Sequence, residues 1–349
     1  MKNKYKNSLF AVLEKTKKPL IIKKLIIPKP SKDQILVKIL YTYICGTQLN
    51  EINGNKGKDN YLPHTLGHEA SGKIRQIGSN VKNFRVGDNV ILSWIKKKNK
   101  DGKTPFYFDL KKKINSGHIS TFSKLSLVSK SRVYKSPKGL PLDIAALFGC
   151  AVPTGFGIVL KYYRKIPKNA YTGVYGVGGV GLMSIIALKA LGFNNIYAVD
   201  KDKKKLEIAK KFGCKYVFNT SEAKDIKKFT LNLDRNKIKF NIEISGNIKL
   251  MEIAYKYLSK DGIFVLAGNP KKNKKISIDP YDLIFGKRIF GFSGNDISLE
   301  KNINFFSKIL KIVGIKKLRK LYKTYSFNNI NIAINDFSKG KTLRPLIKL

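Results

Sequence analysis

The stretch Ala170–Leu191, AYTGVYGVGGVGLMSIIALKAL, decides the fold. Its first part, Ala170–Tyr175, is an apolar run that predicts a buried strand, and Gly179–Leu191 predicts a helix. The loop between them is rich in glycine because the turn is tight, the backbone has to approach a pyrophosphate and the helix has to pack closely on the sheet. The predicted cofactor-binding residues of this loop are Gly176, Gly178, Gly179, Val180 and Gly181.

Strands and helices alternate from this stretch onward. A strand is predicted at Asn195–Val199 and a helix at Lys203–Phe212. Further apolar runs predict strands at Phe240–Ile244 and Ile263–Ala267, with the helix Lys249–Leu258 between them. Such alternation implies a doubly wound parallel sheet covered by helices, the Rossmann arrangement, in an α/β protein.

Asp200 stands at the end of the second predicted strand. A carboxylate at this place accepts hydrogen bonds from the ribose hydroxyls of the cofactor and repels a 2′-phosphate, which favours NAD over NADP. The lysines that follow, among them Lys203 and Lys205, weaken this preference because they attract a phosphate.

The chain before Ser136 has a different rhythm. Short apolar or alternating runs such as Gln34–Tyr43, Gly72–Ile77 and Asn89–Trp94 predict a strand-rich domain. Ile95–Lys113 is polar, carries two triple-lysine runs and is expected to be a surface loop. The tail, with a predicted helix at Ile303–Val313 and a strand-like end, is expected to return to this domain. The expected domains are therefore 1–150 with 288–349, and 151–287.

Composition bounds the possible functions. The 69 Lys and Arg residues against 23 Asp and Glu give a net charge of +46, which would attract any polyanion. The lysines are scattered over the whole length, so the sequence favours a uniformly solvated surface without a specific nucleic-acid site, and weak binding at low salt. Neither a signal peptide at Met1–Leu20 nor a membrane span is indicated, and we expect a cytoplasmic protein.

The three cysteines are Cys45, Cys150 and Cys214. They lie far apart and are odd in number, which argues against a disulfide framework and leaves them for metal binding or catalysis. Two thiolates and an imidazole, such as that of His68, form a ligand set that holds a catalytic zinc with one open position. Spacing alone does not establish such a site, because a buried cysteine commonly serves as a small hydrophobic residue.

Several separated motifs, in order, make the chain resemble the zinc-containing medium-chain alcohol dehydrogenases over nearly its whole length. The motifs are Cys45-Gly46-Thr47, Leu66-Gly67-His68-Glu69, Val86-Gly87-Asp88-Asn89-Val90, Ser120-Thr121-Phe122, Gly149-Cys150 to Gly157, the glycine loop with Asp200, and Gly340-Lys341-Thr342-Leu343-Arg344. The resemblance implies a β-rich GroES-like catalytic domain made from both chain ends and a central Rossmann domain that binds NAD.

The resemblance also implies roles for individual residues. Cys45, His68 and Cys150 become the ligands of one catalytic zinc, and Glu69 becomes a neighbour that can approach the metal. Thr47 would hydrogen-bond the substrate oxygen and start the proton relay. The remaining assignments are Trp94 and Phe122 in the substrate pocket, although core packing is the ordinary explanation of an aromatic residue, and Lys205 and Arg344 at the cofactor ribose and pyrophosphate.

The chain departs from the family pattern in three places. Gln48 replaces an aspartate that hydrogen-bonds the ligand imidazole, and a neutral amide can still orient His68. Asn50 replaces the histidine that completes the proton relay, and an amide does not titrate near neutral pH. The stretch Ile95–Lys113 contains no cysteine, so the second, structural zinc of many relatives is absent. Because the lobe around that zinc supports subunit contacts, a homodimer is only the default expectation.

The sequence therefore predicts a zinc-dependent enzyme that transfers a hydride between NAD and an alcohol or polyol, including sugar derivatives, or the matching carbonyl. Charge in Ile95–Lys113 suggests that this loop overhangs the site and selects a polar or anionic substrate. Two alternatives stay open. One is a zinc-free quinone or enone reductase of the same superfamily, and the other is a basic nucleic-acid-binding protein on a dehydrogenase scaffold.

Overall fold

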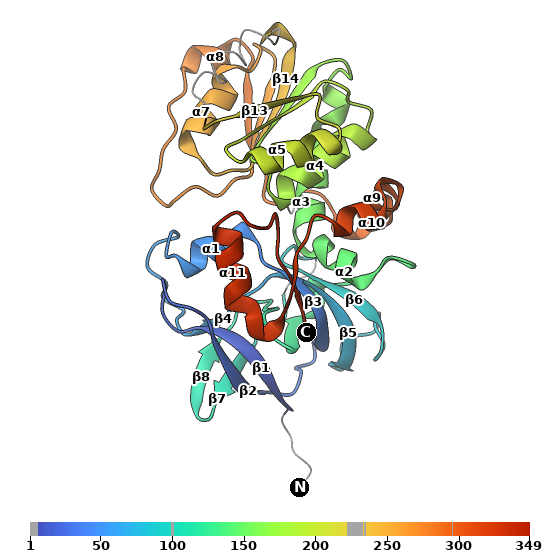
Figure 1. The fold of residues 1–349 in the computed structure, drawn as a ribbon. Coiled ribbons are helices and arrows are strands. Elements are labelled where there is room, and N and C mark those ends of the chain that lie inside the picture. The colour runs from blue at the N-terminus through green and yellow to red at the C-terminus, as the bar shows by residue number, and fades with distance from the viewer. Residues whose placement is uncertain (1–5, 99–100, 222–232, 234, 295) are drawn as a thin grey trace. The chain divides into compact units, whose positions relative to one another are not determined.

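The structure is a computed structural model that describes residues 6–98, 101–221, 233, 235–294 and 296–349. The chain forms two compact units (Figure 1). The first unit consists of Met1–Cys150 and Ser298–Leu349, and the second consists of Ala151–Ile297.

The second unit contains a six-stranded parallel sheet in the order β13-β12-β11-β14-β15-β16. Its strands are β11 (Tyr171–Tyr175), β12 (Ile196–Asp200), β13 (Tyr216–Asn219), β14 (Ile238–Glu243), β15 (Ile263–Leu266) and β16 (Arg288–Gly291). The helices among its described residues are α3 (Ala151–Tyr162), α4 (Gly179–Ala190), α5 (Lys203–Lys211), α7 (Ile248–Lys256) and α8 (Pro280–Ile284). Numbered within the unit, the strand order is 3-2-1-4-5-6, which is the Rossmann order and confirms the predicted fold class.

The first unit is rich in β-structure. Strands β1, β2, β7, β8 and β4 form a closed barrel, and β10, β6, β5, β3, β18 and β17 form a sheet in which β9 also pairs with β3. The barrel strands are β1 (Lys6–Leu13), β2 (Ile21–Ile27), β4 (His64–Thr65), β7 (Phe106–Asp109) and β8 (Lys112–Asn115). The sheet strands are β3 (Gln34–Tyr43), β5 (Glu69–Ile77), β6 (Asn89–Ser93), β9 (Leu125–Ser129), β10 (Val133–Lys135), β17 (Thr324–Ser326) and β18 (Leu346–Lys348).

The helices of the first unit are short except for one in the returning tail. They are α1 (Gly46–Ile52), α2 (Leu142–Ala145), α9 (Leu299–Val313), α10 (Ile315–Arg319) and α11 (Ile330–Ser338). The tail returns as expected, because β18 pairs antiparallel with β3 and so joins the two ends of the chain in one sheet. Among the described residues no single helix is long and apolar enough to cross a membrane. One bent pair of helical segments, Leu142–Gly149 with Ala151–Lys165, has the length and composition of a membrane span, and no other property of a span is shown.

Two expectations are corrected by the structure. The stretch Ile95–Lys113 is not wholly a surface loop, because β7 and the start of β8 lie in it and Tyr107 is fully buried in the barrel core. The second domain boundary lies at 297/298 and not at 287/288, because β16 pairs with β15 and completes the parallel sheet. β7 and β16 have only four residues each and lie close to lysines, so neither forms a long apolar run in the sequence.

Candidate metal and dinucleotide sites

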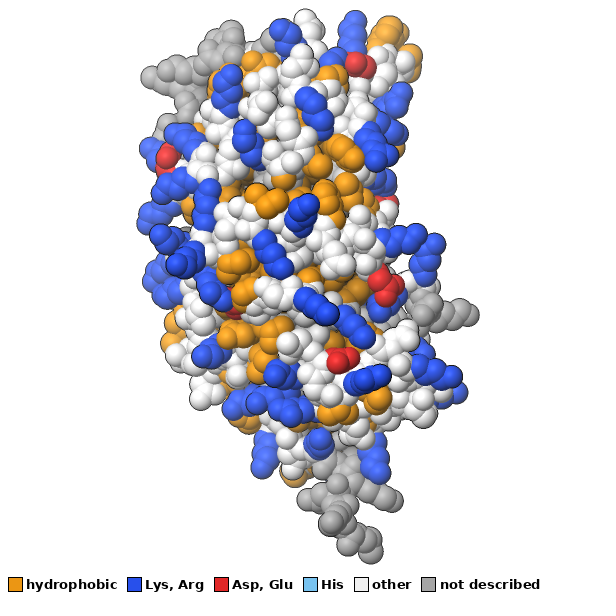
Figure 2. Space-filling model, turned by 90° about the vertical axis from the view of Figure 1, so that its right-hand side faces the viewer, with side chains coloured by type: hydrophobic (Ala, Val, Ile, Leu, Met, Phe, Trp, Pro, Cys, Tyr) orange, Lys and Arg blue, Asp and Glu red, His pale blue; other side chains and the backbone are white. Residues whose placement is uncertain are grey.

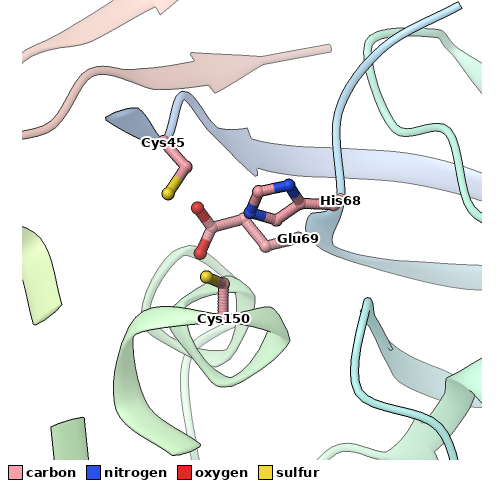
Figure 3. A group of neighbouring side chains, drawn as sticks. All are labelled: Cys45, His68, Glu69 and Cys150. Carbon is pink, nitrogen blue, oxygen red and sulfur yellow. The ribbon is translucent and has the colours of Figure 1, made fainter. Parts of the chain in front are cut away.

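Four side chains of the first unit converge in one cluster (Figure 3). The ligand atoms of Cys45, His68, Glu69 and Cys150 all lie within 4.8 Å of one another. Cys45 follows β3 and precedes α1, whereas His68 and Glu69 stand at the start of β5, the antiparallel neighbour of β3. Strand pairing therefore brings residues that are distant in sequence to the same end of the sheet.

Cys150 reaches the cluster through a close approach of the backbone at Gly149. A Cβ atom at residue 149 would lie 2.5 Å from both the Cα atom of Glu69 and the carbonyl oxygen of Leu92. Only a glycine fits there, and the Ser93 hydroxyl donates a hydrogen bond of 2.7 Å to the Gly149 carbonyl. The Gly149-Cys150 motif thus has a steric reason that does not depend on a metal.

The cluster has the chemistry of a zinc site. His68 Nε2 and Glu69 Oε2 are buried and have no hydrogen-bond partner in the described structure. The hydrogen bond from the Cys150 thiol holds the pKa of the Cys45 thiol well below its usual range despite burial, with help from the positive charge of Arg344. A low pKa favours the thiolate, the form that binds metal, and two sulfurs with one imidazole nitrogen suit zinc.

Two neighbouring side chains hold the ligands in place. The Gln48 amide is buried and hydrogen-bonds His68 Nδ1, while its carbonyl oxygen accepts a 3.0 Å hydrogen bond from the backbone N–H of Cys45. Gln48 thus orients the imidazole as expected for a neutral substitute of aspartate. The Thr47 hydroxyl lies 3.9 Å from the Cys45 sulfur, and its role at the substrate oxygen stays a prediction.

A cavity of about 620 Å³ adjoins this cluster within the first unit, and both Thr47 and His68 line it. The other polar or charged side chains that line it are Gln48, Glu51, Lys56, Lys58, Asp59, Tyr61, His64, Thr65, Thr104, Asn115, Ser116 and His118. The residues of the Ile95–Lys113 stretch that were expected to overhang the site, above all Lys96–Lys98, are not part of this lining, whereas Thr104 is.

The two predicted pocket aromatics do not line this cavity. Phe122 is fully buried in a hydrophobic core cluster, and its ring would lie 2.7 Å from a Cβ atom at Gly67. Core packing therefore accounts for Phe122. Trp94 is half-buried, and its indole nitrogen has no partner in the described structure. A role for Trp94 at the substrate stays a prediction.

Arg344, predicted to bind the cofactor pyrophosphate, is buried and forms an ion pair with Glu69. Both partners are almost inaccessible to solvent, with 2% and 0% exposure. The sequence did not predict this pair, because no local pattern connects residues that lie so far apart along the chain. A role of Arg344 at the pyrophosphate stays a prediction.

Removing one partner of this buried pair should be costly. We expect Arg344→Met to lower the free energy of unfolding by about 3–5 kcal/mol, because the Glu69 carboxylate is then buried without a counterion. Glu69→Gln combined with Arg344→Met removes the unpaired charge and should recover most of the loss. Urea denaturation of the metal-free protein measures both, and equal stabilities of the single variant and wild type would contradict the assignment.

The glycine loop of the second unit has the predicted construction. Gly176 has φ +97°, and a Cβ atom at Gly181 would lie 2.0 Å from the Gly176 carbonyl oxygen, so both positions need glycine. A Cβ atom at Gly178 would meet nothing within 4 Å, and α4 begins directly after it without a side-chain cap. The free helix amides and the open space beside them fit a pyrophosphate.

Asp200 lies at the end of β12, beside this loop. Its carboxylate accepts hydrogen bonds from the backbone N–H groups of Val177 at 2.7 Å and Asp202 at 3.0 Å, which fixes it against the glycine loop. Lys205 lies half-buried in the first turn of α5, which Asp202 caps. The strand, the loop, the helix and the acidic residue thus have the relative placement that dinucleotide binding requires.

A second buried carboxylate, not predicted from the sequence, lies close to the same loop. Glu243 ends β14 opposite Tyr175 of β11, and its Oε1 accepts a hydrogen bond of 2.9 Å from the Gly246 N–H. Burial raises the pKa of Glu243 to about 7, although the bonds from Ser245 and Gly246 oppose the shift. The only sequence signal is an acidic residue inside an apolar run.

The raised pKa of Glu243 makes a testable contribution to the pH dependence of stability. Between the ordinary carboxyl pKa of 4.5 and about 7, the folded state holds a proton that the unfolded chain has released. Stability from this group is therefore present below pH 4.5 and is lost as pH rises to about 7, by about 1.4 kcal/mol for each pH unit crossed. Relative to Glu243→Gln, wild type should lose stability across this window in thermal unfolding, and a constant difference would contradict this.

The comparisons with known proteins agree with this geometry. Residues 179–308 match the family "Zinc-binding dehydrogenase", and residues 31–138 match "Alcohol dehydrogenase GroES-like domain". Alcohol dehydrogenase class-3 of Zea mays is 31% identical over 79% of this chain and 80% of its own, and that of Dictyostelium discoideum is 27% identical over 97% of both.

Solved structures are similar over the whole chain. Benzyl alcohol dehydrogenase from Acinetobacter calcoaceticus has a TM-score of 0.85 with 28% identity over 99% of both chains. An alcohol dehydrogenase zinc-binding domain protein from Burkholderia ambifaria has a TM-score of 0.87 with 24% identity over 99% of both chains. At this identity, the similarity shows that the two chains share a fold.

The two units and their sites define the class of the protein, an alcohol-oxidising oxidoreductase built from a GroES-like and a Rossmann domain. The chain belongs to the family of zinc-containing medium-chain alcohol dehydrogenases. Membership implies zinc and NAD as cofactors and a small alcohol or carbonyl compound as substrate, and the Cys45, His68 and Cys150 donors suit that zinc.

Proposed function

We propose that this enzyme uses one zinc ion and NAD to oxidise a small polar alcohol, such as a polyol or a sugar derivative, or to reduce the matching carbonyl. The observation that carries the proposal is the convergence of Cys45, His68 and Cys150 around an imidazole nitrogen that has no other partner in the described structure. A zinc-free reductase would have no use for this arrangement of two thiols and an oriented imidazole.

Each residue of the cluster has a defined task. Cys45, His68 and Cys150 would hold zinc, and Gln48 keeps the imidazole turned toward it. When bound, zinc acts as a Lewis acid that lowers the pKa of an alcohol. Arg344 neutralises Glu69, so that this carboxylate does not add an unbalanced charge beside two thiolates. The Thr47 hydroxyl, next to the Cys45 sulfur, can take up the substrate proton at Oγ1 while it releases its own hydroxyl proton to water in the adjoining cavity.

The second unit supplies the site for the cofactor. The glycine loop would hold the pyrophosphate against the amides of α4, and Asp200 would accept hydrogen bonds from the ribose. When bound, NAD takes up the hydride from the substrate. The carboxylate of Asp200 repels a 2′-phosphate, which supports NAD over NADP.

The cavity beside Thr47 and His68 supports a polar substrate, because side chains that can hydrogen-bond a hydroxyl-rich molecule make up most of its lining. The Asn50 amide cannot pass a proton onward, and the carboxyl and imidazole groups in this lining are those of Glu51, Asp59, His64 and His118. His64 Nε2 lies 2.8 Å from Asp59 Oδ2, so this pair is already engaged within the protein.

Replacing one sulfur ligand tests the zinc assignment. Cys45→Ala should reduce bound zinc to a small fraction of one ion per chain and lower NAD-dependent oxidation of polyols by more than about 100-fold. Cys214→Ala is the matched control, because Cys214 is also buried but lies in the second unit. Elemental analysis and a substrate screen with NAD and NADP provide the measurements. Undiminished activity of Cys45→Ala would favour the zinc-free reductase.

We also propose that the enzyme is a homodimer assembled through the second unit. β16 is an edge of the parallel sheet, and no other described strand pairs with its outer side. Exposed apolar side chains lie on β16 itself and on α8 and the residue after it, which precede β16 in the chain, namely Phe290, Tyr281, Leu283, Ile284 and Phe285. An open strand edge beside such a patch is self-complementary under a two-fold axis and supports pairing with a second copy.

A single charge in this patch should separate the subunits. Ile284→Lys is expected to weaken the dimer by more than about tenfold in dissociation constant, because the side chain would be buried at the interface. Ile312→Lys is the control, since Ile312 is 76% exposed and Ile284 74%, but Ile312 lies on α9 of the first unit. Sedimentation equilibrium gives both constants, and a monomeric wild type would refute the proposal.

A further inference from the structure

A groove of about 980 Å³ lies in the first unit, apart from the cavity beside the metal cluster. One wall is α9, and the other consists of the end of β10 with the segment 136–138, the residues Asn83 and Phe84, and Lys97. We call it the α9 groove. It shares no lining residue with the cavity beside the metal cluster, so the proposed dehydrogenase reaction does not use it.

The α9 groove is strongly positive. Five lysines line it against a single carboxylate, that of Glu300, and the lysines are Lys97, Lys135, Lys138, Lys308 and Lys311. Lys97 pairs with Glu300 at 3.0 Å, and the Lys311 ammonium donates a hydrogen bond of 2.9 Å to the Lys138 carbonyl. In the described part of the chain Lys135, Lys138 and Lys308 pair with no carboxylate. Their charges are therefore available to an anion.

Two hydroxyl groups of this lining lack partners. Ser307 of α9 is only 3% exposed, and its Oγ forms no hydrogen bond within the described structure. The Oγ of Ser136, on the opposite wall, is buried and equally without a partner. A buried hydroxyl without a hydrogen bond destabilises a fold, and because both serines line the groove, a ligand there that the two side chains turned toward would supply the missing bonds.

The groove also offers apolar contacts. Phe84, Tyr134 and Ile303 line it, and the Lys97 ammonium lies 5.2 Å and 5.1 Å from the centroids of the Phe84 and Tyr134 rings. A volume of this size suits a small molecule and not an extended polymer. Lysines and hydroxyls recognise phosphate oxygens, and the aromatic and aliphatic side chains can cover an organic group attached to the phosphate.

We propose that the α9 groove binds a small organic phosphate, a site separate from the dehydrogenase centre. Lys135 and Lys308 contact the phosphate, and the hydroxyls of Ser136 and Ser307 donate hydrogen bonds to it. Lys97 exchanges Glu300 for the ligand, since Glu300 is exposed and loses little when it is released into water.

This site differs from the general lysine surface. Lys and Arg side chains are spread over the face in Figure 2, with few Asp and Glu among them, so attraction of anions at low salt is expected everywhere. Simple attraction disappears near physiological salt, and it does not depend on a buried serine. The groove adds the two unpartnered hydroxyls and the apolar lining, which a flat surface lacks.

The test is isothermal titration calorimetry of the full chain at physiological salt with phenyl phosphate and with inorganic phosphate. We expect one site per chain and tighter binding of phenyl phosphate. Lys135→Glu with Lys308→Glu should weaken this binding at least about tenfold. Lys301→Glu with Lys316→Glu changes the charge equally on exposed residues outside the groove and should leave the affinity within about twofold.

Ser307→Ala separates a ligand-binding role from a structural one. It should weaken phenyl phosphate binding by about threefold to tenfold, while the melting temperature of the ligand-free protein stays equal or rises, because an unpartnered buried hydroxyl is removed. A lower melting temperature with unchanged affinity would mean that Ser307 is structural and would overturn the proposal.

Other results also overturn it. These are no binding at physiological salt, equal weakening by both double variants, binding that survives Lys135→Glu with Lys308→Glu, and equal affinity for phenyl and inorganic phosphate. A short RNA that binds more tightly than phenyl phosphate and loses affinity in the groove variants would instead assign the groove to nucleic acid.

Discussion

The buried ion pair between Arg344 and Glu69 is the interaction on which the catalytic unit depends. It connects the start of β5, where the candidate zinc ligand His68 lies, with the tail of the chain. The Cys45 sulfur, whose low pKa favours the thiolate, and the Glu69 carboxylate lie within 4.8 Å of each other and would repel each other as anions without a neighbouring cation. The hydrogen bond from Cys150 is the main cause of the low pKa of Cys45, and the same guanidinium adds to it, so a contact with the tail of the chain supports the cluster.

This dependence explains why both ends of the chain build one unit. β18 pairs with β3, which leads directly to Cys45, while the backbone of Pro345, next to Arg344, accepts a hydrogen bond from Ile44. The tail is thus attached to the strand that positions the first ligand. The second unit is inserted between Cys150 and the returning tail, and its glycine loop and Asp200 depend only on its own sheet.

Much of the fold and of the candidate site was predictable, because the governing contacts are local. Gly176, Gly181 and Asp200 lie within one strand–helix–strand unit, and their spacing alone demands the tight turn seen in the structure. The hairpin that contains Tyr107 was not predictable, since its lysines mask a strand whose burial depends on barrel partners far away in sequence. The buried carboxylate of Glu243 was not predicted either, because its burial also depends on distant segments. Its unusual pKa comes from burial beside a loop of another strand.

The sequence by itself determined the Rossmann unit, the ligand types at Cys45, His68 and Cys150, and the lack of cysteines for a second zinc in Ile95–Lys113. These are properties of residue type and short-range order. Only the tertiary structure decided that Phe122 belongs to the core, that Gln48 holds His68, and that Ser307 lines a lysine-rich groove with its hydroxyl unpartnered in the described structure. The physical reason is that burial and hydrogen-bond partners depend on contacts between segments that meet only when the chain folds. No single segment of sequence contains that information.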